Sequence, residues 1–434
     1  MTRGVEALHA LSAVEARRRI AAGELSALAY AQALIERIDA TEPAVQAWAW
    51  FEAEALLAQA RECDAQRAAE LVLGALSGLP VGVKDIVDTA GVPTELGTPL
   101  HAGRVPAEDA AVVQRLRRAG GLMAGKTVTT ELATYAPGKT RHPLDARHTP
   151  GGSSSGSAAA VAAGMLPLAI GTQTNGSVIR PASFCGVVGF KPSCGRIERE
   201  GVLVQSPTLD QIGVFGRSVE DVALLAGALC DDQAMRSTPV APPTPPRLAI
   251  VRTPFWPRLD ADARAAFDAF AASLGASAAE VDLPIDAEAA VQTHHLIMEA
   301  EISASFADEY ARGRDRLSAS LRGQIERGRA TPVTEHRAAV ASIPLLRAAL
   351  DALFDGFDAI VTPASLGTAP LGLGHTGDPL MCTLWTLLGL PALSLPLLRG
   401  ANGLPLGVQL VGRFDGDGPL LAAATALMSR PREL

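Results

Sequence analysis

The stretch LPVGVKDIVD, Leu79–Asp88, has the apolar pattern of a buried β-strand, yet Lys84 stands in its middle. An unpaired ammonium group is costly to bury, so a lysine in such a strand either reaches out to water or loses its proton. Asp85 is not an easy partner, because successive strand residues point to opposite faces. Lys84 therefore either reaches solvent or is buried for a chemical purpose.

Outward from this strand, short apolar runs alternate with helical stretches. The helical run DAAVVQRLRRAG precedes the apolar run LMAGKT, and GSAAAVAAGM precedes LPLAIGT. Such alternation predicts an α/β layered fold. Residues 1–72 have helical spacing, with Ser26 as the N-cap of one helix, and we expect this segment to pack on the core.

A proline-rich stretch at 237–246 is interpreted as a stiff surface connector. Beyond it come a strand at 248–251, an alanine-rich helix from about Asp260, and late strands in FDAIVTPA, GLPALSLPLL and GVQLVG. These strands resemble those before the connector. We therefore expect one large α/β domain over residues 1–434 rather than two domains.

Composition excludes several classes of protein. The 434 residues carry a net charge of −8, which repels a phosphate backbone, and only 4% are aromatic, which disfavours stacking on single-stranded nucleic acid. The N-terminus lacks the apolar core of a signal peptide, and the apolar runs are too short to span a bilayer. Five scattered cysteines favour neither disulfides nor zinc, so we expect a cytoplasmic protein.

Two motif matches fail on their context. GGLMAGKT, residues 120–127, fits the phosphate-loop pattern, but a helix precedes it and a strand follows Gly120, which is the reverse of the required order. GSSSG, residues 152–156, fits a nucleophile elbow with Ser154 at its centre, but polar loop sequence precedes it. The available partners, His375 and Asp378, also come in the wrong order for that fold.

Two further segments accompany Lys84. TPGGSSSGSAAAVAAG, residues 149–164, is a Gly/Ser loop that leads into an alanine-rich helix. LAIGTQTNGSVIRPASFCG, residues 168–186, is a buried strand that ends in a polar turn and presents Ser177 after Gly176. Successive N–H groups in such a turn can form an anion-binding nest, as an oxyanion hole requires. Cys185 is interpreted as a core thiol rather than a rival nucleophile.

Together, the three segments resemble the amidase signature family of Ser-Ser-Lys amide hydrolases. GLPVGVKD matches the context of the family's lysine, PGGSSSGSAA matches its Gly/Ser signature, and CGVVGFKPS follows the serine as the family expects. The resemblance implies a single α/β/α layered domain with a central mixed β-sheet, a cis peptide bond before the first serine, and neither metal nor cofactor. The residues it implies are catalytic Lys84, Ser153 and Ser177, with oxyanion-hole N–H groups from Thr174, Asn175, Gly176 and Ser177.

The turn departs from the family pattern GTDxGGSxRxP. Gln173 replaces the aspartate, Asn175 replaces a glycine, and Arg180 comes one residue later than expected. The three catalytic positions are unchanged, but the details of the loop and any contact of the arginine are uncertain from sequence.

The predicted function is hydrolysis of a small carboxamide to a carboxylate and ammonia or amine. Lys84, neutral because it is desolvated, draws the proton of Ser177 through Ser153. The expected partner is a small-molecule amide, with no nucleic acid, no membrane and a possible homodimer. The alternative is a glutaminase-type subunit of a transfer-RNA-dependent amidotransferase complex, which shares the fold.

Overall fold

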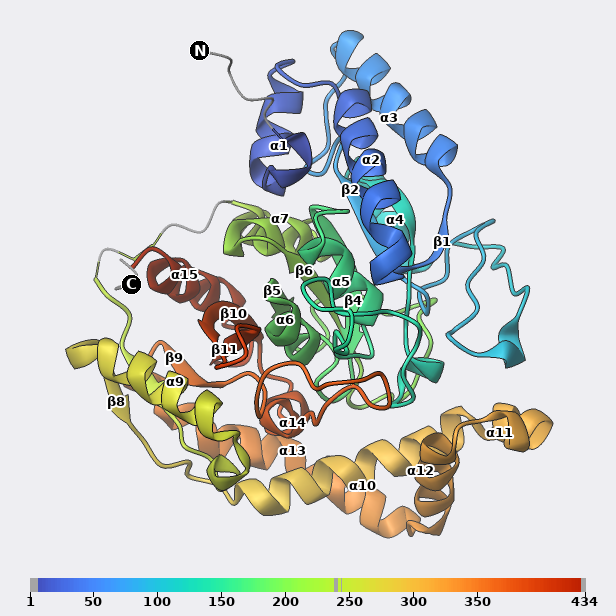
Figure 1. Cartoon of the computed structure of the whole chain (residues 1–434). Helices are drawn as coiled ribbons and strands as arrows, with labels where there is room; N and C mark the ends of the chain where they lie inside the picture. The colour runs from blue at the N-terminus through green and yellow to red at the C-terminus, as the bar shows by residue number, and fades with distance from the viewer. Residues whose placement is uncertain (1–6, 238–240, 243, 431–434) are drawn as a thin grey trace.

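The computed structural model describes residues 7–237, 241–242 and 244–430, and no helix within these residues is both long and apolar enough to cross a membrane. Eleven strands among them form one sheet, which lies at the centre of the molecule (Figure 1). In chain order the strands are β1 (Trp48–Phe51), β2 (Pro80–Lys84), β3 (Leu122–Thr127), β4 (Leu168–Gln173), β5 (Val188–Lys191), β6 (Gln211–Gly216), β7 (Leu248–Ile250), β8 (Ala278–Glu280), β9 (Ala359–Pro363), β10 (Ala392–Arg399) and β11 (Pro405–Val411).

The sheet is mixed, with the spatial order β1-β3-β2-β4-β6-β5-β10-β11-β9-β7-β8. β2 runs parallel to both β3 and β4, and β7 runs parallel to both β9 and β8. From β4 to β9 each neighbouring pair is antiparallel. The prediction of a single α/β domain with a central mixed sheet is confirmed.

Helices cover the sheet, whose central strands β2, β4, β5 and β6 are buried along their whole length, as in sheets with two covered faces. The helices are α1 (Ala13–Ala21), α2 (Ala27–Val45), α3 (Ala53–Ala68), α4 (Ala111–Arg118), α5 (Ser155–Ala162), α6 (Ile179–Cys185), α7 (Val219–Leu229), α8 (Gln233–Arg236), α9 (Ala261–Ser273), α10 (Ala287–Ser305), α11 (Ala307–Gly313), α12 (Ala319–Ala330), α13 (Val333–Asp351), α14 (Leu380–Leu387) and α15 (Asp417–Met428). In Figure 1, α1–α3 lie at one end of the molecule and α10–α13 at the other.

The N-terminal segment differs from the helical prediction at one place. Residues 48–51 form β1, an edge strand antiparallel to β3, between α2 and α3. α2 stops at Gln46, which adopts a left-handed conformation, and the following Trp-Ala-Trp-Phe run suits a strand. Ser26 is the N-cap of α2, because its side chain accepts a hydrogen bond from the Ala29 N–H. Residues 1–6 lie outside the described residues.

The predicted connector at 237–246 is only partly described, since residues 238–240 and 243 lie outside the described ranges. The strands on its two sides nevertheless belong to one sheet, because β5 pairs with β10. The exact limits of the domain, 1–434, stay a prediction.

Candidate active site

Lys84 is the last residue of β2, which lies between β3 and β4, and its side chain is fully buried. The Nζ atom donates hydrogen bonds to Ser153 Oγ at 2.7 Å and to Thr172 Oγ1 at 2.8 Å. Burial lowers the pKa of Lys84 well below its ordinary value, and the negative charge of Asp210 opposes that change only in part. Lys84 therefore does not reach solvent, and its amine is poised to be neutral.

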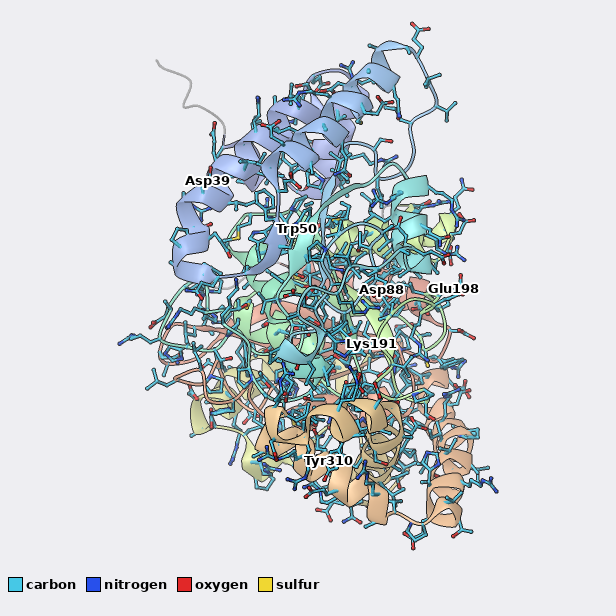
Figure 2. The ribbon with its side chains drawn as sticks, turned by 90° about the vertical axis from the view of Figure 1, so that its right-hand side faces the viewer. Asp39, Trp50, Asp88, Lys191, Glu198 and Tyr310 are labelled. Atoms are coloured by element: carbon cyan, nitrogen blue, oxygen red, sulfur yellow. The ribbon has the colours of Figure 1, made fainter. Side chains whose placement is uncertain are left out.

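Two other lysines, Lys126 on β3 and Lys191 on β5, are also fully buried, and Figure 2 labels Lys191 within the molecule. Lys126 donates to the Val87 carbonyl, and Lys191 donates to the Leu390 carbonyl. Carbonyl oxygens can only accept, so they favour a charged lysine. Lys84 differs because both of its partners in the described residues are hydroxyl groups, which can also donate to a neutral amine.

The surroundings of Lys126 also exclude the phosphate-loop interpretation. Lys126 lies in strand β3, which follows helix α4, so the order of elements is the reverse of a phosphate loop. The Lys126 side chain donates to Thr94 Oγ1 at 2.9 Å in addition to the backbone. Burial lowers the pKa of Lys126, and the carboxylate of Asp85 opposes that change by raising it. Lys126 thus stabilises the loop after β2 rather than a nucleotide.

The Gly/Ser loop brings Ser153, and not Ser154, to Lys84. The peptide bond between Gly152 and Ser153 is cis, as the family resemblance implies. Ser154 Oγ donates to the Thr172 carbonyl at 3.1 Å and accepts from the Thr172 N–H at 3.2 Å, so it joins the loop to β4.

The two partners considered for a nucleophile elbow do not contact Ser154. His375 accepts a hydrogen bond from the Gly377 N–H, and Asp378 pairs with Arg258 at 2.7 Å. The elbow interpretation therefore has no support in the geometry.

We expect Ser154→Ala to fold and to keep its activity within about fivefold of the wild type, because a hydroxyl that bonds only to backbone contributes about 1 kcal/mol. Ser153→Ala should lose activity by about 10²-fold or more, since it removes the hydroxyl that contacts Lys84. Steady-state kinetics on both variants, with thermal melts as the check on folding, measure the contrast. The opposite ranking would contradict the assignment of Ser153.

Ser177 lies in the turn between β4 and α6, and 9% of its surface is exposed. Gln173, the residue that departs from the family pattern, shapes this turn. Its Oε1 atom accepts from the N–H groups of Val178 and Ile179 at 2.8 and 3.0 Å, and its Nε2 atom donates to Thr386 Oγ1 at 2.9 Å. Gln173 thus fixes the first turn of α6, directly after Ser177.

Contacts from distant parts of the chain hold the rest of the turn. Thr174 Oγ1 donates to Asp210 Oδ1 at 2.6 Å, and the Thr174 carbonyl hydrogen bonds His294 of α10 at 2.9 Å. Asn175 Oδ1 accepts from Thr383 Oγ1 of α14 at 2.7 Å. The supporting roles of Asp210, His294 and Thr383 were not predicted, because no local motif marks these residues.

The backbone N–H groups of residues 174–177 donate to no protein acceptor in the described part of the chain. Free N–H groups on a rigid turn suit a developing oxyanion. No hydrogen bond joins Ser153 to Ser177 among the described residues, so that step of the predicted relay remains a proposal. Burial raises the pKa of the Cys185 thiol, whose Sγ contacts the Pro150 carbonyl at 3.5 Å, so a reactive thiolate is disfavoured there.

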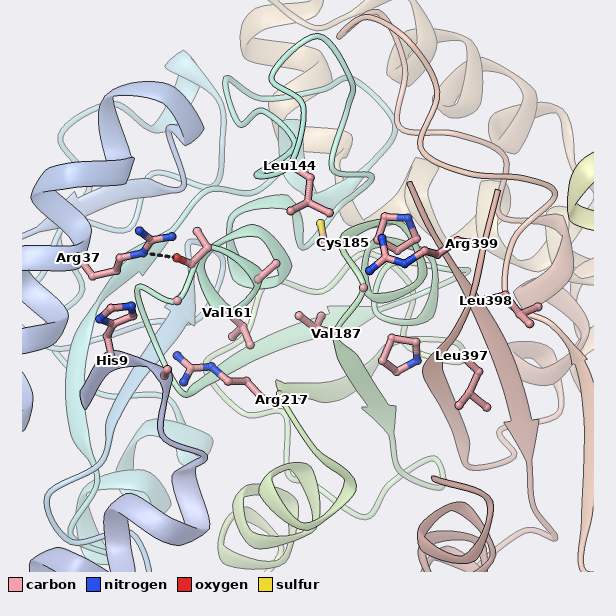
Figure 3. A pocket seen from close by; sticks show the side chains of 17 residues that line it. His9, Arg37, Leu144, Val161, Cys185, Val187, Arg217, Leu397, Leu398 and Arg399 are labelled. Atoms are coloured by element: carbon pink, nitrogen blue, oxygen red, sulfur yellow. Dashed lines mark hydrogen bonds between the residues drawn. The ribbon is translucent and has the colours of Figure 1, made fainter. Parts of the chain in front are cut away.

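A cavity of about 610 Å³ lies elsewhere in the molecule, between the N-terminal helices and the β10–β11 hairpin (Figure 3). Neither Lys84 nor either serine lines it. Its arginines are engaged by backbone: Arg37 Nε donates to the Ala163 carbonyl at 2.7 Å, and Arg217 Nη1 donates to the Leu11 carbonyl at 2.6 Å. Lys84, Ser153 and Ser177 therefore lie outside this cavity.

Comparisons with known proteins place nearly the whole chain in a family. The family model described as Amidase matches residues 29–421. One subunit of the glutamyl-tRNA(Gln) amidotransferase of Chloroflexus aggregans is 34% identical, with 96% of each chain covered. A crystal structure of an amidase has a TM-score of 0.87 at 31% identity and covers 97% of this chain and 100% of its own. A structure from "an unexpected vestigial protein complex" that reveals "the evolutionary origins of an s-triazine catabolic enzyme" has a TM-score of 0.87 at 29% identity, covering 96% and 98%.

The fold and the matches define an enzyme that acts on linear C–N amide bonds. More particularly, the chain belongs to the amidase signature family.

The expected partners need correction. A small-molecule amide alone, with a possible homodimer, was predicted, but the relative with 34% identity is one subunit of an amidotransferase. The net negative charge of the sequence could not reveal a protein partner, because a catalytic subunit can bind another protein without itself binding RNA.

Proposed function

We propose that the chain hydrolyses a carboxamide through an acyl-enzyme on Ser177, with Lys84 as the base and Ser153 as the relay between them. The observation that carries this proposal is the 2.7 Å contact between Lys84 Nζ and Ser153 Oγ at a fully buried lysine. A lysine can act as a base only when neutral, and burial favours the neutral form. The free N–H groups of residues 174–177 would stabilise the negative charge that develops on the carbonyl oxygen of the substrate.

In the first half-reaction Ser177 Oγ forms a bond to the carbonyl carbon. Its proton passes to Ser153 Oγ, which gives its own proton to Lys84 Nζ. The negative charge moves to the carbonyl oxygen, where the N–H groups of the turn stabilise it; loss of one such donor typically costs about 2.7–4 kcal/mol. The C–N bond then breaks, and the proton returns from Lys84 through Ser153 to the leaving nitrogen.

In the second half-reaction water attacks the ester on Ser177 by the same route. One water proton passes through Ser153 to Lys84, and it returns to Ser177 Oγ as the bond between that oxygen and the acyl carbon breaks; the carboxylic acid released then loses its own proton to solvent. One proton relay therefore serves both halves.

Rapid quench of the enzyme with an amide substrate, followed by intact-mass and peptide mass spectrometry, tests this proposal. The expected result is one acyl group per chain, located on the peptide that contains Ser177. An acyl group on Ser154 or Cys185 would overturn it.

A second proposal concerns the assembly. We infer that the chain works as the amidase subunit of a multi-subunit complex, with glutamine as the amide donor of a transfer-RNA-dependent amidotransferase. The support is the amidotransferase relative, which aligns over 96% of both chains. The structure described as a vestigial protein complex also fits a subunit better than a free-standing enzyme. A cytoplasmic location is a further prediction, supported by five cysteines that are all free thiols.

Co-expression with the remaining amidotransferase subunits of the same organism tests the assembly. A stable complex whose glutaminase activity exceeds that of the isolated chain by about tenfold or more would support it. An isolated chain that is fully active on simple amides and forms no complex would overturn the subunit proposal, while leaving the acyl-enzyme chemistry intact.

A further inference from the structure

The turn at residues 174–177 pairs its carbonyl groups with side chains but leaves its N–H groups unpaired. The Thr174 carbonyl accepts from His294 Nε2 at 2.9 Å, and the Asn175 carbonyl accepts from Thr386 Oγ1 at 2.5 Å. The N–H groups of Asn175 and Gly176 donate to no acceptor in the described part of the chain. Buried backbone groups of both kinds are normally paired, so this one-sided pairing calls for an explanation.

The paired carbonyls control the direction of the unpaired N–H groups. The Asn175 carbonyl and the Gly176 N–H belong to one planar peptide group, so a donor that holds the carbonyl also fixes where the N–H points. Hydrogen bonds in a chain also polarise one another, which strengthens each by about 10–30%. A donor at this carbonyl therefore makes the Gly176 N–H both better aimed and stronger.

Thr386 reaches the carbonyl because one face of α14 packs on the turn. Cys382, one helical turn before Thr386, lies against Gly176, where a β-carbon would be 3.3 Å from its Sγ. Thr383 donates to Asn175 Oδ1 at 2.7 Å. Residues three and four positions apart share a helix face, so α14 presents all three side chains to the turn. Only 1% of the Thr386 surface is exposed, so its hydroxyl is shielded from solvent.

Gln173 is oriented by its contacts with α6. Its Oε1 atom accepts from the N–H groups of Val178 and Ile179, which places the Nε2 atom toward Thr386. An amide nitrogen can only donate, so Thr386 Oγ1 accepts from Gln173 and must direct its own hydrogen elsewhere.

The Thr386 hydroxyl has two carbonyls within reach. The Asn175 carbonyl lies at 2.5 Å and the Cys382 carbonyl at 3.1 Å, so the shorter contact is to the turn. The hydrogen bonds therefore run in one direction, from the N–H groups of α6 through Gln173 and Thr386 to the Asn175 carbonyl.

We propose that Gln173 and Thr386 are positioning residues that together aim and strengthen the Gly176 N–H as a donor to the oxyanion. The inference rests on the proposed function, because it assumes that attack by Ser177 creates an oxyanion at this turn. A carboxylate at position 173 could accept from α6 but could not donate to Thr386. The hydroxyl would then donate to that carboxylate and leave the Asn175 carbonyl without its donor. The glutamine is thus the residue type that this direction of hydrogen bonding requires.

Acetylation by p-nitrophenyl acetate tests the role of the Thr386 hydroxyl. The acetyl group is transferred to Ser177 Oγ, p-nitrophenolate leaves, and the Ser177 proton passes to the Lys84 relay. Stopped-flow measurements separate the rate constant of acetylation from the binding of the ester. A lost oxyanion donor costs about 10²–10³-fold in rate, and a misaimed donor costs part of that. Thr386→Val, which keeps the shape, should therefore lower the rate constant by about 10- to 100-fold with little change in ester binding. Thr386→Ser, which keeps the hydroxyl, should stay within about threefold of the wild type.

Gln173→Glu tests the direction of the hydrogen bonds. The glutamate keeps the side-chain length and accepts from the α6 N–H groups, which hold it ionised, but it takes the Thr386 hydroxyl hydrogen for itself. It should lower the rate constant by about tenfold when Thr386 is present and by less than about twofold in Thr386→Val. A charge that acted directly on the oxyanion would instead lower the rate by the same factor in both proteins.

Thermal melts report whether each variant folds. The inference would be overturned if Thr386→Val reacted as fast as the wild type, if Thr386→Ser lost as much as Thr386→Val, or if Gln173→Glu had equal effects in both proteins. An unchanged rate in Gln173→Glu would also overturn it, and that measurement does not depend on the folding of Thr386→Val. Acetylation of Ser177→Ala at the wild-type rate would instead overturn the proposed function.

Discussion

Ser177→Ala is expected to lower kcat by about 10⁴-fold or more on any amide that the wild type hydrolyses, while leaving KM and the melting temperature nearly unchanged. The hydroxyl is the atom that bonds to the carbonyl carbon, and removal of the nucleophile from a catalytic set costs about as much as removal of the whole set. The side chain of Ser177 donates or accepts no hydrogen bond in the described residues, so folding should tolerate its loss.

Single-turnover and steady-state kinetics measure this effect, with Ser154→Ala as the matched control, since Ser154 is a serine in the neighbouring loop that contacts only backbone. If Ser177→Ala kept a tenth of the wild-type kcat, the acyl-enzyme account would be wrong.

Lys84→Met is expected to lower kcat/KM by about 10³-fold or more, because methionine fills the same space but cannot accept a proton. In the wild type, kcat/KM should rise with pH as Lys84 loses its proton. Because burial lowers the pKa of Lys84, this rising limb of the pH profile should lie well below the pH at which an ordinary lysine titrates. The rising limb should be missing from the residual activity of the variant. An unchanged pH profile in Lys84→Met would remove Lys84 from the mechanism.

The same variant should be more stable than the wild type near neutral pH. In the unfolded chain a lysine keeps its proton up to pH about 10.4, whereas burial lowers the pKa in the folded protein. The unfolded state therefore binds more protons, and wild-type stability rises with pH between the two pKa values. Methionine lacks this penalty, so Lys84→Met should melt at a higher temperature than the wild type near pH 7, and the difference between the two melting temperatures should narrow as the pH approaches 10. A gap that is constant with pH would contradict a neutral Lys84.

The sequence was sufficient to predict those parts of the site that are carried by local patterns. The apolar run around Lys84 left two alternatives, a lysine that reaches solvent and a lysine buried for chemistry, and the family resemblance favoured the second; the lysine is fully buried at the end of β2. The helix after the Gly/Ser loop and the strand before Ser177 were also predicted, and they became α5 and β4. Each of these features depends on residues within a few positions of one another, where strand and helix periodicity apply.

Contacts between distant segments could not be predicted in this way. Thr383 and Thr386 hold Asn175 from more than 200 positions away, and no spacing rule links them to the turn. Thr172 shares Lys84 with Ser153 only because β2 and β4 are neighbours in the sheet. The strand β1 was missed because it is short and lies between two long helices, where the helical pattern dominates the sequence.

The central claim, that Lys84 is a neutral amine when the enzyme works, is open to direct titration. The chain has only four lysines, Lys84, Lys126, Lys139 and Lys191. Protein labelled with ¹³C and ¹⁵N at the lysine side chains gives few signals, and Lys84→Met identifies the one of interest. The account predicts that the Lys84 signal loses its proton at or below the pH at which hydrolysis begins and is neutral throughout the active range. A Lys84 signal that stays charged across that range would contradict it.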